Sequence, residues 1–213
     1  MITFRNILFS VLVIAGMQTV QAQENNIETI FKSPGRSGGY GAISNKFTTI
    51  NGEFANIVEL YGGWYINQRF LIGGGFAGST NYISVPQEFS TMPGLRMSYQ
   101  YGQVGLVTDY IIASNKAVHV GFHVMTGAGF TLQYYRPSSW SDLGQYDYYD
   151  YDHDENWFFM IEPGIQVELN VLRWMRFSPG ISYRFIDGSN AKGLTDNDLR
   201  GASVNLTFKF GRF

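Results

Sequence analysis

The sequence predicts an all-β fold: an eight-stranded antiparallel transmembrane β-barrel whose two chain ends lie on the same side. Three observations lead to this prediction. Several segments of about 10 residues alternate apolar and polar positions, the connections between them alternate short and long, and the composition is rich in aromatic residues and glycine. An even strand count brings both termini to one end, as bacterial barrels require.

Few residues are charged and many are aromatic. Charged residues make up 15% of the 213-residue chain, against roughly 25% in soluble domains, and aromatic residues make up 16%. The net charge of −2 gives no reason to expect nucleic acid as a partner. The chain has no Cys, which excludes disulfides, thiolate metal sites, cysteine nucleophiles and a lipid-modified N-terminal cysteine.

The N-terminus has the features of a secretory signal peptide over residues 1–22. Arg5 provides the positive start, Ile7–Met17 forms an apolar core of 11 residues, and Ala22 stands where cleavage is expected. A membrane anchor is the alternative, but spanning takes about 20 apolar residues and this run is too short. We therefore expect a signal peptide, a polar periplasmic lead-in over residues 23–37, and a barrel domain over residues 38–213.

The second half of the chain shows the strand pattern most clearly, because apolar residues occupy alternate positions in four segments. Small, polar or charged residues stand between them, as lumen-facing positions require. The four apolar, lipid-facing sets are Val118, Val120, Phe122, Val124, Ala128 and Phe130; Phe159, Ile161, Pro163, Ile165, Val167 and Leu169; Phe177, Pro179, Ile181, Tyr183 and Phe185; and Ala202, Val204, Leu206, Phe208 and Phe210.

The first half is less regular, although four more strands are expected there. Val58, Leu60, Trp64 and Ile66 form a lipid face in the second of them, whereas Gly73-Gly74-Gly75 interrupts the alternation in the third. The register of the first and the fourth is open by one residue, and such a slip would exchange both faces of a strand. The four expected strands are Gly38–Phe47, Phe54–Ile66, Arg69–Thr80 and Met97–Ile111.

The connections distinguish the two ends of the predicted barrel. The short ones, expected on the periplasmic side, are Asn67-Gln68, Ser114–Lys116 and Asn170–Trp174. The external loops are Thr49–Glu53, which is short, and the long segments Asn81–Arg96, Gln133–Asn156 and Asp187–Leu199. A soluble β-sandwich is the alternative fold, but it does not readily explain this rhythm together with aromatic apolar faces and a terminal Phe213.

Six charged side chains are expected to point into the barrel: Glu59, Glu162, Glu168, Arg176, Arg184 and Lys209. An eight-stranded barrel is just wide enough to be filled by its own side chains, and buried charges must be paired. We therefore predict a charge network that plugs the lumen, with a narrow gated pore as the alternative. His119 and His123 share this face about 13 Å apart, so we interpret them as polar lumen residues and expect no metal site.

The third external loop combines tyrosine and aspartate. Tyrosine offers rigid contact area at low entropy cost, which suits binding of a sugar or protein. Three aspartates also resemble the start of a calcium loop, but Glu155 and Ile161 stand where that loop requires Gly and Glu. Calcium binding and a plain aromatic girdle remain the alternatives. The candidate ligand- or partner-binding residues are Tyr135, Trp140, Tyr148, Tyr149, Asp150, Asp152 and Asp154.

Five short motifs follow one another along the chain: Gly38–Gly41, Asn51–Phe54, Gly62–Trp64, Phe70–Gly75 and the terminal Asn205–Phe213. In this order they resemble the small outer-membrane β-barrels of the porin family, of the OmpA and OmpX type, and above all those of Bacteroidetes. The resemblance implies an outer-membrane location with both termini periplasmic. It also implies contact with outer-membrane lipid and insertion by the assembly machinery, which recognises a C-terminal strand ending in an aromatic residue.

The final strand departs from the usual form of that signal. Alternation back from Phe213 would place apolar residues at three positions that hold Gly211, Lys209 and Thr207. A bulge at Gly211-Arg212 would restore the phase, because glycine tolerates the required backbone angles. Unbroken strand pairing through Gly211 would remove this hypothesis.

These features predict a structural or interaction protein of the outer membrane that displays the Tyr/Asp loop and is a candidate subunit of a larger outer-membrane complex. A narrow channel for small solutes or ions is the alternative. A lipid-modifying enzyme is the weakest reading, because His119 is followed by Val120-Gly121 rather than by the His-x-Ser element of lipid A deacylases. We expect no enzymatic activity and no cofactor, with other outer-membrane proteins as candidate partners.

Overall fold

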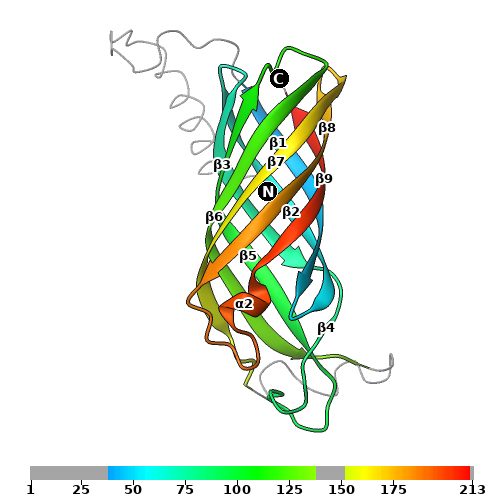
Figure 1. The fold of residues 1–213 in the computed structure, drawn as a ribbon, viewed down its shortest axis with the longest axis vertical. Coiled ribbons are helices and arrows are strands. Elements are labelled where there is room, and N and C mark those ends of the chain that lie inside the picture. Colours follow the sequence, from blue (N-terminus) through cyan, green and yellow to red (C-terminus); the bar gives the residue numbers. More distant parts are fainter. Residues whose placement is uncertain (1–37, 138–151, 212–213) are drawn as a thin grey trace, which may run out of the picture. The chain divides into compact units, whose positions relative to one another are not determined.

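Eight antiparallel strands close into a barrel in the computed structural model, which describes residues 38–137 and 152–211 (Figure 1). The ring closes where β1 pairs with β9 and where β3 pairs with β5, which confirms the predicted fold class. The barrel strands are β1 (Gly38–Ile50), β2 (Glu53–Ile66), β3 (Phe70–Ser79), β5 (Met97–Ile112), β6 (Val118–Tyr135), β7 (Asn156–Leu172), β8 (Met175–Asp187) and β9 (Gly201–Gly211). A two-residue strand, β4 (Ile83–Ser84), pairs with β5, and a one-turn helix, α2 (Asp196–Leu199), precedes β9.

The predicted signal peptide and lead-in, residues 1–37, lie outside the described residues, as do residues 138–151 and 212–213. The domain boundaries at Ala22 and Gly38 therefore stay predictions. Within the described residues, no helix has the length and apolar character needed to cross a membrane.

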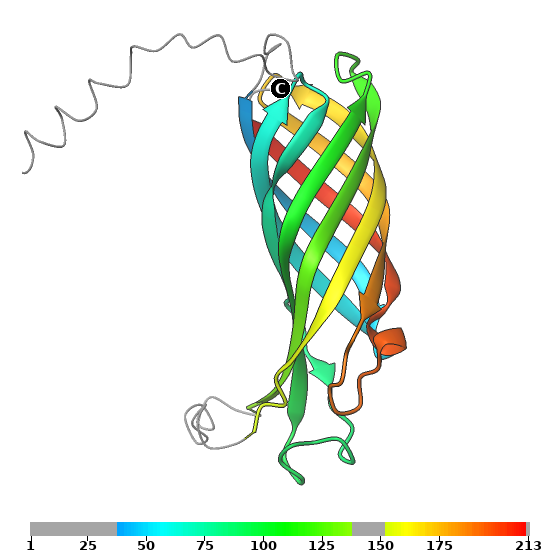
Figure 2. The same ribbon diagram turned by 90° about the vertical axis from the view of Figure 1, so that its left-hand side faces the viewer.

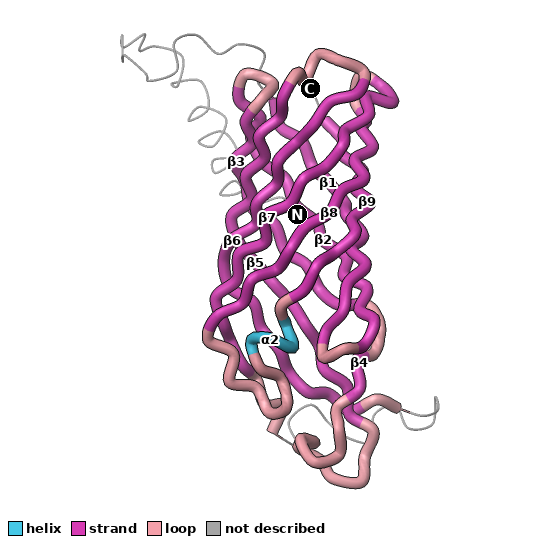
Figure 3. Tube along the Cα trace, viewed as in Figure 1, coloured by secondary structure: helices cyan, strands magenta, loops and turns pink. Residues whose placement is uncertain are grey.

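The connections give the barrel two different ends (Figures 2 and 3). At the turn end, the short turns Asn67–Arg69, Ala113–Ala117 and Arg173-Trp174 join neighbouring strands; at the loop end, the connections 80–96, 136–155 and 188–200 are long. The β1–β2 connection at the loop end is short, and its Asn51 and Gly52 have φ angles of 52° and 74°, the left-handed pair of a type I′ hairpin. The predicted alternation of short and long connections is confirmed.

Both ends of the described barrel chain lie at the turn end. Gly38 pairs with Tyr65 at the end of β2, and Gly211 pairs with Tyr40. The even number of strands therefore brings the start of β1 and the end of β9 together, as the sequence predicts.

Side chains alternate between the lumen and the outer wall along the barrel strands. On β6, Val118 and Phe122 are exposed on the wall while His119 and His123 are buried inside. The outward phase predicted for β6, β7, β8 and β9 is confirmed, and so is that of β2, where Trp64 is 56% exposed.

The pairing of β1 and β5 establishes the two registers that the sequence leaves open. Lys46 of β1 is buried and lies opposite Ile57, and Asp109 of β5 is buried and lies between Leu71 and His123 of the neighbouring strands. Even-numbered residues of β1 and odd-numbered residues of β5 therefore face the lumen.

Glycines allow neighbouring strands to approach closely across one side of the barrel. A Cβ atom added to Gly63 would stand 2.3 Å from the carbonyl oxygen of Ile72, and one added to Gly105 would stand 2.2 Å from that of Thr126. Both distances lie far inside van der Waals contact, so no side chain fits at either position. Gly73–Gly75 pair with β2 and β5 in the same region, so this run interrupts the apolar alternation without ending the strand.

The final strand pairs without interruption up to its last described residue. The β1–β9 register runs residue by residue from Val204 to Gly211, so the bulge hypothesised at Gly211 is wrong as far as the described residues extend. A side chain at 211 has no room, because its Cβ would stand 2.3 Å from Tyr40 Cβ. The register irregularity that does occur near the turn end lies between Asn170 and Leu172.

Candidate functional site

The outer wall of the barrel carries no charged side chain between its two ends among the described residues. Exposed apolar and aromatic side chains cover it instead. On β2, Phe54 and Trp64 stand ten positions apart near opposite ends of this surface. That separation is roughly 33 Å along the strand, or about 25 Å along the axis at a tilt near 40°, which matches the apolar band of transmembrane barrels.

The charges within the strands point into the lumen and balance one another. Four cationic side chains and four carboxylates are buried there, none of them more than 2% exposed. The structure places all six predicted lumen residues in this set and adds Lys46 and Asp109. The cations are Lys46, Arg176, Arg184 and Lys209, and the acids are Glu59, Asp109, Glu162 and Glu168.

Lys46 is the centre of a first ion cluster. Its Nζ lies 2.7 Å from Glu59 Oε2 and 2.9 Å from Glu162 Oε1. The Ser182 hydroxyl donates to Glu162 Oε1 at 2.6 Å, and the Gln103 amide donates to Glu162 Oε2 at 3.3 Å. Each oxygen of Glu162 therefore has a donor, which a buried carboxylate requires.

A second ion cluster lies nearer the turn end, around Glu168. Lys209 Nζ lies 2.5 Å from Glu168 Oε1 and 2.9 Å from Asp109 Oδ2. Arg176 Nη1 donates to Glu168 Oε2 at 3.1 Å, and His119 Nε2 lies 3.0 Å from the same oxygen. Nitrogen atoms from β6, β8 and β9 thus surround a single carboxylate of β7.

His123 connects the two clusters. Its Nδ1 lies 2.6 Å from Asp109 Oδ1, and its Nε2 lies 3.6 Å from Glu59 Oε1. The Tyr40 hydroxyl also donates to Asp109. His119 and His123 contact different carboxylates, in agreement with their interpretation as polar lumen residues.

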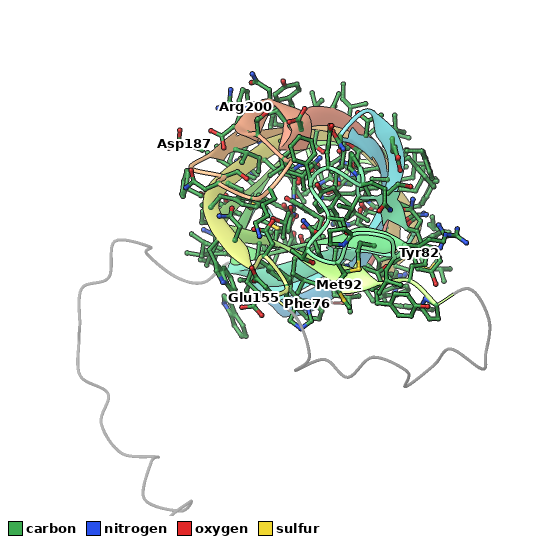
Figure 4. The ribbon with its side chains drawn as sticks, turned by 90° about the horizontal axis from the view of Figure 1, so that it is seen from below. Phe76, Tyr82, Met92, Glu155, Asp187 and Arg200 are labelled. Carbon is green, nitrogen blue, oxygen red and sulfur yellow. The ribbon has the colours of Figure 1, made fainter. Side chains whose placement is uncertain are left out.

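Arg184 connects the charge network to the loop end. Its Nε donates to the Leu199 carbonyl oxygen at 2.7 Å, its Nη2 donates to that of Thr49 at 3.3 Å, and its guanidinium carbon lies 4.9 Å from the centre of the Tyr101 ring. Apolar side chains from the loops and strand ends are buried beside it, and side chains fill the interior in the view onto this end (Figure 4). This apolar cap consists of Ile83, Val85, Met97, Tyr99, Leu194 and Leu199.

A cavity of about 10 Å³ lies within the network, with Lys46, Glu59, Tyr61, His123 and Gln166 among its lining residues. This volume has room for about one water molecule. At this level the side chains of the described residues therefore fill the lumen, and this cavity is too small for a solute.

Three of the seven candidate loop residues belong to the described part of the chain. Tyr135 is half-buried at the end of β6. The Asp154 carboxylate accepts hydrogen bonds from the Lys192 backbone N–H at 2.7 Å and from the Gln133 amide at 3.4 Å, which connects two loops. Asp152 is exposed and accepts a hydrogen bond from the Asp154 N–H at 2.9 Å, which lowers the pKa of its carboxyl. Trp140, Tyr148, Tyr149 and Asp150 lie outside the described residues.

Within residues 38–137 and 152–211, no group of three or more His, Asp or Glu side chains is arranged to hold a metal ion. The described aspartates of the third loop use their oxygens in contacts within and between loops.

Among the described residues, Lys46 and Asp109 are the charged lumen residues that the sequence reasoning missed, and they lie on the two strands of open register. The sequence nevertheless contains an observation that places both side chains in the lumen. A charged side chain on the lipid face of a transmembrane strand costs roughly 2–4 kcal/mol near the middle of the membrane, so a lone charge within such a strand should face the lumen. That rule assigns both registers correctly.

Comparisons with known proteins support the fold of the chain but do not assign it to a family. No protein-family model matches the chain, and no curated protein is similar in sequence. The structure of Neisserial surface protein A (NspA) superposes with a TM-score of 0.55 at 8% identity, covering 84% of this chain and 99% of that one. Ail, the attachment invasion locus protein of Yersinia pestis, gives a TM-score of 0.45 at 14% identity, with 85% and 100% covered. The β-barrel domain of Pseudomonas aeruginosa OprF gives 0.46 at 8% identity, with 84% and 99% covered.

Proposed function

We propose that this protein is a structural and interaction protein of the bacterial outer membrane: a closed barrel that displays the Tyr/Asp loop to a ligand or partner protein. The filled lumen carries the proposal. A neutral ion network beneath an apolar cap leaves a cavity of about 10 Å³, which favours a supporting role over transport. The uncharged wall of membrane height supports the membrane location, and the fold shared with NspA agrees with an outer-membrane barrel.

The loop end is the side on which we place the interaction. The two strands that carry the Tyr/Asp loop, β6 and β7, are the longest of the barrel, at 18 and 17 residues. Strands of about 9–11 residues suffice to cross a membrane, so paired β-structure continues past the wall and holds the base of the loop firmly. A loop with a rigid base loses less conformational entropy when it binds a ligand or partner, so it is well suited to present a binding surface.

Replacement of residues 138–151 by a Gly/Ser linker of equal length tests the display role. Asp152–Glu155 are kept, because Asp154 connects this loop to Lys192. Cross-linked complexes are purified from native outer membranes, and the co-purifying outer-membrane proteins and glycans are quantified. We expect the linker variant to lose its enriched partners at least tenfold.

A control variant changes the same end without changing the loop, through Glu88→Gln and Asp187→Asn, both exposed residues. This variant should keep the partners, and all proteins should show the heat-modifiable gel migration of a folded barrel. Retention of the same partners by the linker variant would contradict the display role.

Conductance in planar bilayers tests the closed lumen independently. We expect the purified wild-type protein to give no steady pore in the nanosiemens range, because the side chains of the ion network surround a cavity of only about 10 Å³. A steady pore of that size would favour the channel alternative. The lipid-modifying alternative gains no support from His119 and His123, because both point into the lumen, where they contact carboxylates, rather than toward lipid.

A further inference from the structure

The charges outside the lumen are unequally divided between the two ends of the barrel. In the part of the chain that the structure describes, the loop end carries eight acidic and four basic side chains. Among the described residues, the turn end carries three exposed basic side chains, Arg69, Lys116 and Arg173, and no acidic side chain outside the lumen network. One end therefore attracts cations and the other attracts anions.

A polar cavity opens between the turns of this basic end, which lie together at the upper end of the barrel in Figures 1 and 2. Its volume of about 840 Å³ is within the range of small-molecule sites. We call it the turn-end cup. It is lined by Gln68, Ser114, Asn115, Asn170, Val171, Leu172, Arg173 and Arg176.

The lining of the turn-end cup suits an anion. Arg173 is exposed and contributes a guanidinium group, while Gln68, Ser114 and Asn115 bring amide and hydroxyl donors. The Asn170 side chain donates to the Lys116 carbonyl oxygen at 2.8 Å, which holds neighbouring turns together. Guanidinium groups favour phosphate, because they present several N–H donors in one plane.

Glu168, the carboxylate that pairs with the lining residue Arg176, is already neutralised. Glu168 lies 3.1 Å from Arg176, 2.5 Å from Lys209 and 3.0 Å from His119. Its negative charge therefore does not cancel the field of Arg173, Arg69 and Lys116 at the mouth. Arg176 also lines the cup, but its charge is paired with Glu168, so the net positive charge at this end comes from the three exposed residues.

The cup has an apolar edge toward the membrane. Val171 and Leu172 belong to its lining and are exposed, and Trp174 beside them stacks on Phe210 with ring centres 6.2 Å apart. Exposed tryptophan next to cationic residues is typical of a membrane interface. In a phospholipid bound here, the phosphate would lie near the cationic residues and the acyl chains near these apolar side chains.

We propose that the turn-end cup binds a phosphate-bearing anion. The phosphate can belong to the headgroup of an anionic phospholipid in the adjoining leaflet or to a soluble phosphate compound. The two sources share one recognition chemistry, namely Arg173 with the neutral donors of the turns. The two sources differ in one contact. A lipid would also contact Val171, Leu172 and Trp174 through its acyl chains, whereas a soluble phosphate compound would not.

The test uses the full-length protein folded in phosphatidylcholine nanodiscs, with or without phosphatidylglycerol, and measures retained lipid by native mass spectrometry. A second arm titrates inorganic phosphate into protein in pure phosphatidylcholine and follows the amide resonances of residues 113–117. The variant Arg173→Gln removes one charge from the cup. Lys192→Gln removes one charge from an exposed residue at the loop end and is the matched control.

We expect phosphatidylglycerol to be retained over phosphatidylcholine, and Arg173→Gln to lower that preference roughly fivefold, since one basic residue at a membrane surface is worth about 1 kcal/mol. Lys192→Gln should leave the preference unchanged. Lipid retention without a phosphate response identifies a lipid headgroup, and a phosphate response sensitive to Arg173→Gln identifies a soluble ligand. The proposal would be overturned if Arg173→Gln kept both the lipid preference and the phosphate response. It would also be overturned if Lys192→Gln reduced these signals as much as Arg173→Gln does.

Discussion

Lys46→Met is the sharpest test of the lumen network, because it removes the cation that lies between two buried carboxylates. Lys46 Nζ lies 2.7 Å from Glu59 and 2.9 Å from Glu162, and all three side chains are at most 1% exposed. Methionine keeps most of the side-chain length and its apolar stem. The substitution therefore changes the charge while leaving the packing nearly unchanged.

The expected loss of unfolding free energy follows from the remaining contacts. Removal of one partner from a buried ion pair costs about 3–5 kcal/mol, because the other charge stays buried without compensation. Glu162 keeps Ser182 and Gln103 as donors, whereas the ion pair that remains to Glu59 among the described residues is the longer contact of 3.6 Å to His123. We therefore expect a loss near the lower end, about 3 kcal/mol.

A second substitution separates charge from packing. Lys46→Met with Glu59→Gln restores the balance of cations and carboxylates and should recover more than half of the loss, because the uncompensated charge is gone. Lys192→Met is the exposed control: its pair with Asp152 at 3.4 Å is more than half exposed on both sides. Such a pair contributes no more than about 1 kcal/mol.

Urea unfolding of protein folded in bilayers, followed by tryptophan fluorescence and heat-modifiable gel migration, measures all three variants. The reasoning would be refuted if Lys46→Met destabilised the barrel by no more than Lys192→Met does. It would also be refuted if the double variant were less stable than Lys46→Met alone. Either result would mean that the ion cluster does not hold the lumen in its closed form.

Two further substitutions test the wall of the barrel by the same unfolding assay. Gly63→Ala should abolish folding, because its Cβ would stand 2.3 Å from the Ile72 carbonyl oxygen. The control Gly41→Ala should fold normally, because its Cβ would stand 3.8 Å from the nearest atom. Equal folding of the two variants would contradict the close strand contact. Leu106→Arg places a charge near the middle of the wall and should cost about 2–4 kcal/mol in a bilayer. A loss below about 0.5 kcal/mol, typical of exposed surface positions, would show that this wall does not face lipid.

Much of the fold could be predicted from the sequence where the contrast between the two faces of a strand is strong. On β7 to β9, aromatic and aliphatic residues alternate with Ser, Gly, Asn and charged residues, so only one phase is compatible with lipid outside. The same contrast made the outward phase of β2 predictable. The long and short connections then identified the two ends without any knowledge of the pairing.

The outward phase predicted for β9 is confirmed, whereas the bulge hypothesised to reconcile it with Phe213 is wrong as far as the described residues extend. Counting back from Phe213 assumes that position 211 holds a side chain of the same face, but Tyr40 of β1 occupies that space. The conflict involves residues 171 positions apart in the chain and arises only when the barrel closes. A periodicity argument within one strand contains no information about such a contact.

The lumen network shows why charge balance alone could not reveal its missing members. The set predicted from the sequence holds three cations and three acids, and the observed set holds four of each, so both are neutral. The two sets differ in what they imply for the outer wall. On the lipid face, Lys46 or Asp109 would be a buried charge without a partner. In the lumen, each of them lies within 3 Å of an opposite charge. For a barrel of this size, the exclusion of charge from the outer surface therefore determines the register of an ambiguous strand more reliably than its apolar residues do.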